Sequence, residues 1–132
     1  MSTMLEKSAE YFQAAHLVFN NALYNVTVSN AYYACFHLAI VALDFYRNED
    51  YPIEDTRKRS HKCIIGAFER YLVKEDKRLS VELRGYLKEL EHHRMIADYE
   101  PNYSISREEA AVLLEKAGYF FEVVHYSITR TG

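Results

Sequence analysis

Residues 28–46 have the sequence VSNAYYACFHLAIVALDFY, which includes the longest strongly apolar run of the chain. Wound into a helix, these residues place apolar side chains on almost every side instead of along one stripe. A helix that is apolar all round is buried by its neighbours. The stretch therefore predicts a central helix, beginning near Val28 or Ser29 and ending near Tyr46, that other helices cover on several sides.

The segments on either side of this helix carry the periodicity of amphipathic helices. We expect further helices over about residues 3–21, 60–74 and 79–99, and from Ser106 onward. Asparagines within residues 20–25 favour a turn before the central helix, Pro101 ends the fourth helix, and Ser106 with Glu109 has the spacing of a capping box. With no strand pattern and no repeat, we predict one domain over residues 1–132. Its fold class is all-α, an up-and-down bundle of four long helices plus one shorter helix.

The composition is that of a folded domain with its own core. Of 132 residues, 49% are hydrophobic and 27% charged, and the formal net charge is -3. This charge gives no chain-wide attraction for a polyanion, so a nucleic-acid contact has to come from a local patch. There are 12 tyrosines and no tryptophan. Tyrosine rings with polar tips suit semi-buried seams, subunit interfaces or base-stacking surfaces.

The sequence also indicates in which cellular compartment the protein is found. The N-terminal residues enter an amphipathic pattern directly, without the basic and apolar segments of an export signal. The apolar run at residues 31–43 is shorter than the roughly 20 residues that cross a bilayer. Cys35 and Cys63 fit no CxxC spacing and resemble reduced, buried thiols. We expect a cytoplasmic protein without membrane contact.

Six histidines raise the question of a metal site. His92 and His93 are adjacent, so on a helix they point about 100° apart and cannot both bind one ion. No Glu-x-x-His pairs recur as they do in a di-metal bundle. We therefore expect neither a metal nor a cofactor. We expect His16 and His37 to be core histidines, and His61 to cap its helix or to bond a neighbour.

Arg94 is the residue that a helical scaffold does not explain. It is in phase with Leu87 and Leu90, on a face meant for burial. A guanidinium placed there needs an anion, a carbonyl or a solvent-filled groove. Asp98, four residues later, can form an ion pair with it along the helix. Two interpretations follow: a salt bridge on the flank of the bundle, or an arginine that binds phosphate in a groove between helices or protomers.

A second basic feature is Arg57-Lys58-Arg59, which leads into Ser60 at a helix N-terminus. Free amide groups at such a position attract anions, so one interpretation is a small phosphate-binding patch. The other is a solvated loop whose charges nearby acidic residues balance. No Walker-type loop and no Ser-His-Asp arrangement accompanies either feature.

Several segments together resemble the HEPN family, the higher-eukaryote and prokaryote nucleotide-binding helical domains. They are residues 29–37 (SNAYYACFH), His61 with Phe68, the pattern Arg94-x-x-Ala97-Asp98-Tyr99, and Glu108-Glu109-Ala110. The resemblance implies a bundle of four or more helices that is often dimeric. It also implies a gene commonly placed beside a small nucleotidyltransferase, and some members of the family are metal-independent endoribonucleases that act as toxins. Together with the tyrosine excess, it leads us to predict a homodimer.

Nuclease members of this family share an arginine followed, after four to six residues, by a histidine. Arg94 matches the arginine, but Tyr99, Glu100 and Pro101 stand where the histidine would fall. Two hypotheses follow from this departure. The chain is a module that dimerises, binds nucleotide or RNA phosphate weakly and partners a small nucleotidyltransferase in a toxin-antitoxin-like system. Alternatively, it is a divergent metal-independent endoribonuclease toxin that uses His93, Tyr99 or another residue. The expected phosphate- or nucleotide-binding residues are Arg94, Asp98, Tyr99 and His93.

Overall fold

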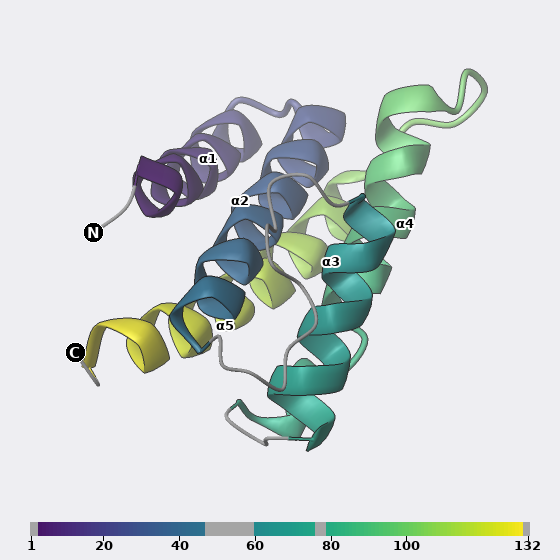
Figure 1. Ribbon diagram of the computed structural model, residues 1–132. Coiled ribbons are helices and arrows are strands. Elements are labelled where there is room, and N and C mark those ends of the chain that lie inside the picture. The colour runs from purple at the N-terminus through teal and green to yellow at the C-terminus, as the bar shows by residue number, and fades with distance from the viewer. Residues whose placement is uncertain (1–2, 47–59, 76–78, 131–132) are drawn as a thin grey trace.

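The chain is helical along most of the length that the structure, a computed structural model, describes: residues 3–46, 60–75 and 79–130. The α-helices are α1 (Thr3–Asn20), α2 (Tyr24–Phe45), α3 (His61–Ala67), α4 (Tyr86–Tyr99) and α5 (Arg107–Arg130) (Figure 1). A π-helix, η2 (Phe68–Glu75), continues α3, and a 3-10 turn, η3 (Val81–Leu83), precedes α4. These described residues contain no strand, so the predicted all-α fold class is confirmed.

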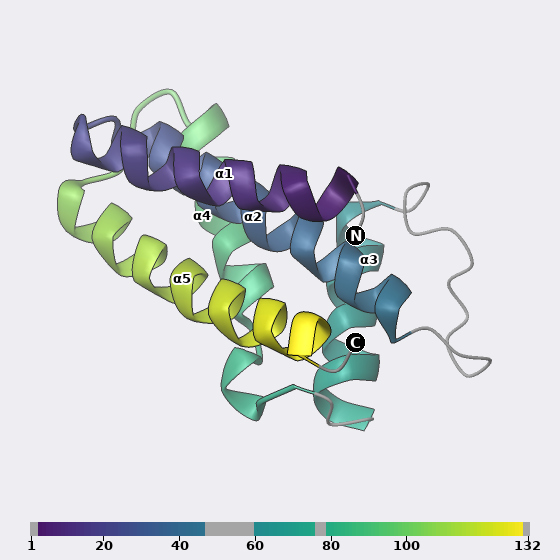
Figure 2. The same ribbon diagram turned by 90° about the vertical axis from the view of Figure 1, so that its left-hand side faces the viewer.

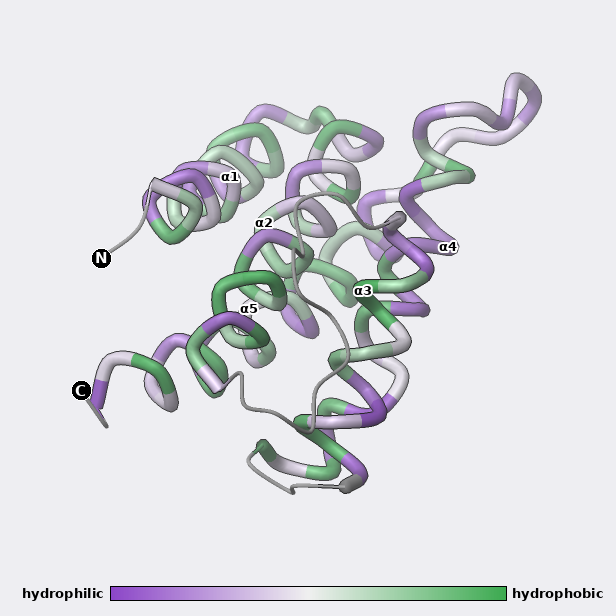
Figure 3. Tube along the Cα trace, viewed as in Figure 1, coloured by the Kyte–Doolittle hydropathy of each residue, from purple (hydrophilic) through white to green (hydrophobic). Residues whose placement is uncertain are grey.

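Helix α2 is the centre of the bundle. It contacts α1, α3, η2, α4 and α5. Figure 2 shows α1 and α5 on one side of α2, and α3 and α4 on the other. The second half of α2 is largely hydrophobic (Figure 3), and Leu38 and Ala39 are completely buried. By length and composition alone α2 could also cross a membrane, but most of its apolar stretch is buried by the other helices, as in a core helix.

Helix α2 begins at Tyr24, about four residues earlier than the sequence suggested. The break between α1 and α2 is confined to a few residues around Ala22, which adopts a left-handed φ of 61°. Asn25 lies inside the helix because its side chain has partners elsewhere. Its Oδ1 accepts a hydrogen bond from the backbone N–H of Ile105 at 2.9 Å, and its Nδ2 donates to Ser104 Oγ at 3.2 Å. Asn25 thus ties α2 to the α4–α5 connection.

The predicted fourth helix is wrong in its first part. Residues 79–85 do not belong to α4, because Gly85 has a left-handed φ of 82° and ends the preceding turn. Glu69 Oε1 accepts a hydrogen bond from the Gly85 backbone N–H at 2.9 Å, which holds this bend against η2. Helix α4 starts only at Tyr86. Arg94 therefore lies in the middle of a 14-residue helix that is anchored at its N-terminal end.

The predicted capping box at Ser106 is confirmed, and Ser60, predicted to open its helix, also caps it. Ser60 Oγ accepts a hydrogen bond from the Cys63 N–H at 3.2 Å at the start of α3. At the start of α5, Ser106 Oγ accepts from the Glu109 N–H, and Glu109 Oε1 accepts from the Ser106 N–H, both at 3.1 Å. This reciprocal pair is the capping box. Residues 47–59, which include the predicted basic patch Arg57-Lys58-Arg59, lie outside the described residues.

Candidate functional site

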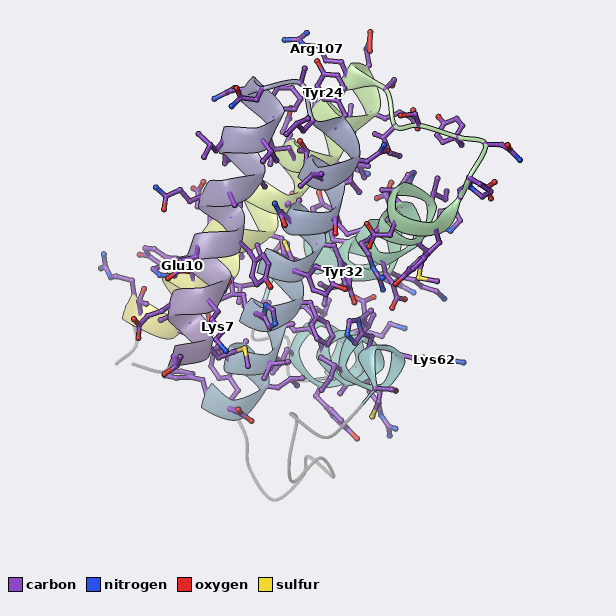
Figure 4. All side chains as sticks on the ribbon, turned by 90° about the horizontal axis from the view of Figure 1, so that it is seen from above. Lys7, Glu10, Tyr24, Tyr32, Lys62 and Arg107 are labelled. Carbon is purple, nitrogen blue, oxygen red and sulfur yellow. The ribbon has the colours of Figure 1, made fainter. Side chains whose placement is uncertain are left out.

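Arg94 projects from α4 into the seam with α2. Only 7% of the residue is exposed. Its guanidinium carbon lies 5.2 Å from the ring centre of Tyr32 and 5.5 Å from that of Tyr33, both on α2, and 5.9 Å from that of Tyr99. Figure 4 shows Tyr32 reaching from α2 toward α3 and α4. Cations within about 6 Å of an aromatic ring centre are attracted by its π-face, so the tyrosines stabilise a charge that burial would otherwise penalise.

Asp98 supplies only part of what this guanidinium needs. Arg94 Nη1 lies 3.6 Å from Asp98 Oδ2, so the intrahelical pair that the sequence predicted is present but long. Charge-assisted hydrogen bonds of this kind usually measure about 2.7–2.9 Å. The Asp98 carboxylate also accepts a hydrogen bond from Ser29 Oγ on α2 at 3.4 Å. Arg94 Nε is buried and has no hydrogen-bond partner. The site thus holds a buried charge with incomplete polar partners.

Arg94 nevertheless stays protonated. Burial by itself would lower the pKa of Arg94, but Tyr33, Tyr32 and Asp98 outweigh this effect and raise the pKa above its ordinary value. The guanidinium is therefore positive at every pH at which the protein folds. Any anion that enters this seam meets a permanent positive charge.

A histidine completes the cluster. Tyr32 Oη and His61 Nδ1, on α3, form a hydrogen bond of 2.8 Å. The His61 ring also stacks on Phe36, with centres 4.0 Å apart. Burial, followed by the positive charge of Arg94, lowers the pKa of His61 below 6.5, so the imidazole is neutral at pH 7. Burial, followed by the charge of Glu91, raises the pKa of Tyr32, which stays a neutral phenol.

Of the expected site residues, the structure brings Arg94, Asp98 and Tyr99 together. His93 has a different partner: its Nδ1 is 2.9 Å from the carbonyl oxygen of Glu89, in the preceding turn of α4. The basic residues Arg57, Lys58 and Arg59 lie outside the described residues. No group of three or more histidine, cysteine, aspartate or glutamate side chains in the described part of the chain could hold a metal ion.

Sequence reasoning missed the α2 and α3 side of the site, namely Tyr32, Tyr33 and His61. All three belong to the segments that carry the family resemblance, and this was the one signal that could have found them. The expectation for His16 was wrong, because this residue is exposed and only touches the edge of Phe12. His37 is half-buried and stacks on Tyr11, with ring centres 5.2 Å apart. His61 bonds a neighbour, as expected.

Comparisons with known proteins define the class of this bundle. The HEPN domain model matches residues 1–127, so the chain belongs to the HEPN domain family. The chain is 27% identical over 120 residues to "Putative toxin MJ0142" from Methanocaldococcus jannaschii, covering 91% of this chain and 76% of that protein. It is also 27% identical over 121 residues to "UPF0332 protein glr0978" from Gloeobacter violaceus, covering 91% of this chain and 89% of that protein.

We predict that the stability of the protein falls as the pH drops below about 6.5, the ordinary histidine pKa. Burial lowers the pKa values of both His61 and His37 in the folded state, so the unfolded chain binds protons that the folded chain does not. Their contribution is complete above the unfolded pKa and is lost as the pH falls toward the folded values. Urea unfolding at pH 7.5 and pH 5.5 measures the loss.

The variant His61→Gln should show a smaller loss of unfolding free energy between these two pH values than the wild type. His16→Gln is the matched control, since it makes the same change at an exposed histidine. An identical loss in the wild type and His61→Gln would contradict the buried, neutral state of His61.

Proposed function

We propose that this HEPN protein is a cytoplasmic component of a toxin-antitoxin-like pair that binds RNA or nucleotide phosphate at Arg94. The observation that carries the proposal is the incomplete pairing of this buried guanidinium. Arg94 has a long contact to Asp98 and a buried Nε without a partner. Guanidinium matches phosphate with two parallel hydrogen bonds, so a phosphate supplies the short contacts that Asp98 does not.

The neighbours of Arg94 suit a nucleotide better than a simple anion. Tyr99 is 68% exposed and lies beside the guanidinium, so its ring is free to stack on a base. His61 offers a further donor. When Tyr32 donates its hydroxyl proton to His61 Nδ1, the neutral imidazole carries its proton on Nε2. Arg94 and His61, which both contact Tyr32, then provide two donors.

The surface next to the site supports a homodimer. Met95 and Tyr103 are each about half exposed, and they lie on and just after α4. Apolar and aromatic side chains at such density are typical of protein interfaces. A second copy that packs here would place two Arg94 sites near each other. The M. jannaschii relative named "Putative toxin MJ0142" supports a toxin-antitoxin-like pair, and the family resemblance points to a small nucleotidyltransferase as the partner protein.

A second function, that of a divergent endoribonuclease toxin, is favoured by the position of His61. In the other neutral tautomer Nδ1 donates to Tyr32 Oη and the Nε2 lone pair is free. It can then take the proton of a ribose 2′-hydroxyl as this oxygen attacks the phosphorus. The P–O5′ bond breaks, the leaving oxygen takes a proton from water, and a 2′,3′-cyclic phosphate forms. Arg94 would stabilise the charge that develops on the phosphate oxygens. His61 would thus replace the histidine that is absent after Arg94.

We predict that Arg94→Ala weakens the binding of an RNA oligonucleotide by about 1.5–3 kcal/mol, the range for a hydrogen bond to a charged group. Arg94→Lys should recover only part of this loss, because an ammonium lacks the planar fork. Fluorescence anisotropy measures affinity, and circular dichroism verifies that helicity is retained. Arg130→Ala, at an exposed arginine of α5, is the matched control. Failure of the wild type to bind RNA or ATP at millimolar concentration would refute the phosphate site.

We predict that light scattering at high micromolar concentration gives twice the 15.5 kDa mass of the chain. Met95→Glu should shift the mass toward the monomer, since it places a charge in the proposed interface. Leu17→Glu, at an exposed leucine of α1 (63% exposed), should remain dimeric. A monomer mass for the wild type would argue decisively against the dimer.

For the nuclease candidate, we predict RNA cleavage that persists in excess EDTA and leaves 2′,3′-cyclic phosphate ends. His61→Ala should reduce the cleavage rate by about 100-fold or more, the typical contribution of a general base. His93→Ala should retain activity, because His93 Nδ1 bonds the Glu89 carbonyl oxygen of its own helix. Intact RNA after prolonged incubation with the wild type would reject this function and leave the binding module.

A further inference from the structure

Aromatic rings continue from the Arg94 site across α2 to α1. The ring of Tyr33, beside the Arg94 guanidinium, lies 5.8 Å from Tyr11 of α1 and 6.2 Å from His37, and His37 stacks on Tyr11 at 5.2 Å. We call Tyr33, His37 and Tyr11 the ring row. Tyr11 is 36% exposed, and Tyr33 and His37 are half-buried, so the row is reached from solvent. These rings are therefore not part of the closed core.

A positive charge stands at each end of the ring row. Arg94 faces Tyr33 at 5.5 Å. At the other end Lys7 lies on α1, one helical turn before Tyr11 (Figure 4). Burial is the main cause that lowers the pKa of His37, and the positive charge of Lys7 lowers it further. Lys7 itself is exposed. The order is thus the buried guanidinium of Arg94, the partly exposed ring row and the exposed ammonium of Lys7.

We propose that the ring row extends the Arg94 site into a binding track for a single-stranded oligonucleotide. This inference rests on the proposed function, because it assumes that Arg94 binds a phosphate. Proteins that hold single strands combine stacking rings with cations that follow the backbone. Here bases stack on Tyr33 and Tyr11, one phosphate meets Arg94, and a later phosphate meets Lys7. The track draws on side chains of three helices, α4, α2 and α1.

The proposed track contacts only base faces and phosphates. RNA and DNA share these groups, so oligonucleotides of both kinds serve as probes. The probes are a fluorescent uridine hexanucleotide, its deoxyuridine counterpart and uridine monophosphate as a competitor. We expect the wild type to bind the hexanucleotide at least about 10-fold more tightly than the monophosphate, because each stacked base adds affinity. Tighter binding of the ribose or of the deoxyribose hexanucleotide identifies which nucleic acid the track takes.

Tyr11→Ala should weaken hexanucleotide binding by about 5- to 150-fold, the range for loss of one stacked base, and leave monophosphate binding unchanged. Tyr126→Ala is the matched control, since this tyrosine of α5 is 57% exposed and lies outside the row. Lys7→Gln should reduce the slope of log affinity against log salt by about 0.7, as expected for one lost contact to a single-stranded backbone. Circular dichroism establishes that each variant is folded.

The outcomes separate the track from the site on which it rests. If Arg94→Ala weakens both ligands while Tyr11→Ala and Lys7→Gln change neither, the phosphate site stands and the track is wrong. Equal affinity of the wild type for the monophosphate and the hexanucleotide overturns the track in the same way. If the wild type binds no probe, the proposed function fails, and the track fails with it.

Discussion

The burial of α2 on all sides is the constraint on which the rest of the structure depends. A helix with apolar side chains in every direction loses water-exposed apolar surface only if other helices surround it. All four other α-helices contact α2. Hydrogen bonds also join α2 to the helices that surround it. For example, Ser8 of α1 donates a hydrogen bond of 2.7 Å to the Ala34 carbonyl oxygen. The need to bury α2 therefore determines where α1, α3, α4 and α5 pack.

The candidate site differs from the rest of this apolar packing because it contains a buried charge. Where α2 meets α4, the buried surface includes a guanidinium packed on tyrosine rings. A buried charge with incomplete hydrogen bonding costs stability unless something compensates for it. The tyrosines compensate in part, and Asp98 adds a long ion pair. A scaffold alone gains nothing from this arrangement, whereas a phosphate-binding site needs a fixed, permanently charged donor.

Tyr32 links the two chemistries of the site. It lies under Arg94 and bonds His61, so the position of the imidazole depends on the same ring that holds the guanidinium. The direction of that one hydrogen bond decides whether His61 Nε2 acts as a donor or as a base. A binding module and a nuclease can therefore share this geometry. Membership of the HEPN family is compatible with both.

The sequence by itself determined the helical class, the central position of residues 28–46, the helix start at Ser60, the capping box at Ser106 and the inward phase of Arg94. All of these follow from local periodicity or from residues close together in the chain. Local pattern failed at residues 79–85, because the left-handed Gly85 is held by a side chain from η2, and at Asn25, whose partners are 79 and 80 residues away. Only the tertiary structure decided what Arg94 faces. Tyr32, Tyr33 and His61 reach it from two other helices, and the spacing of residues within one helix carries no information about side chains that packing brings from another.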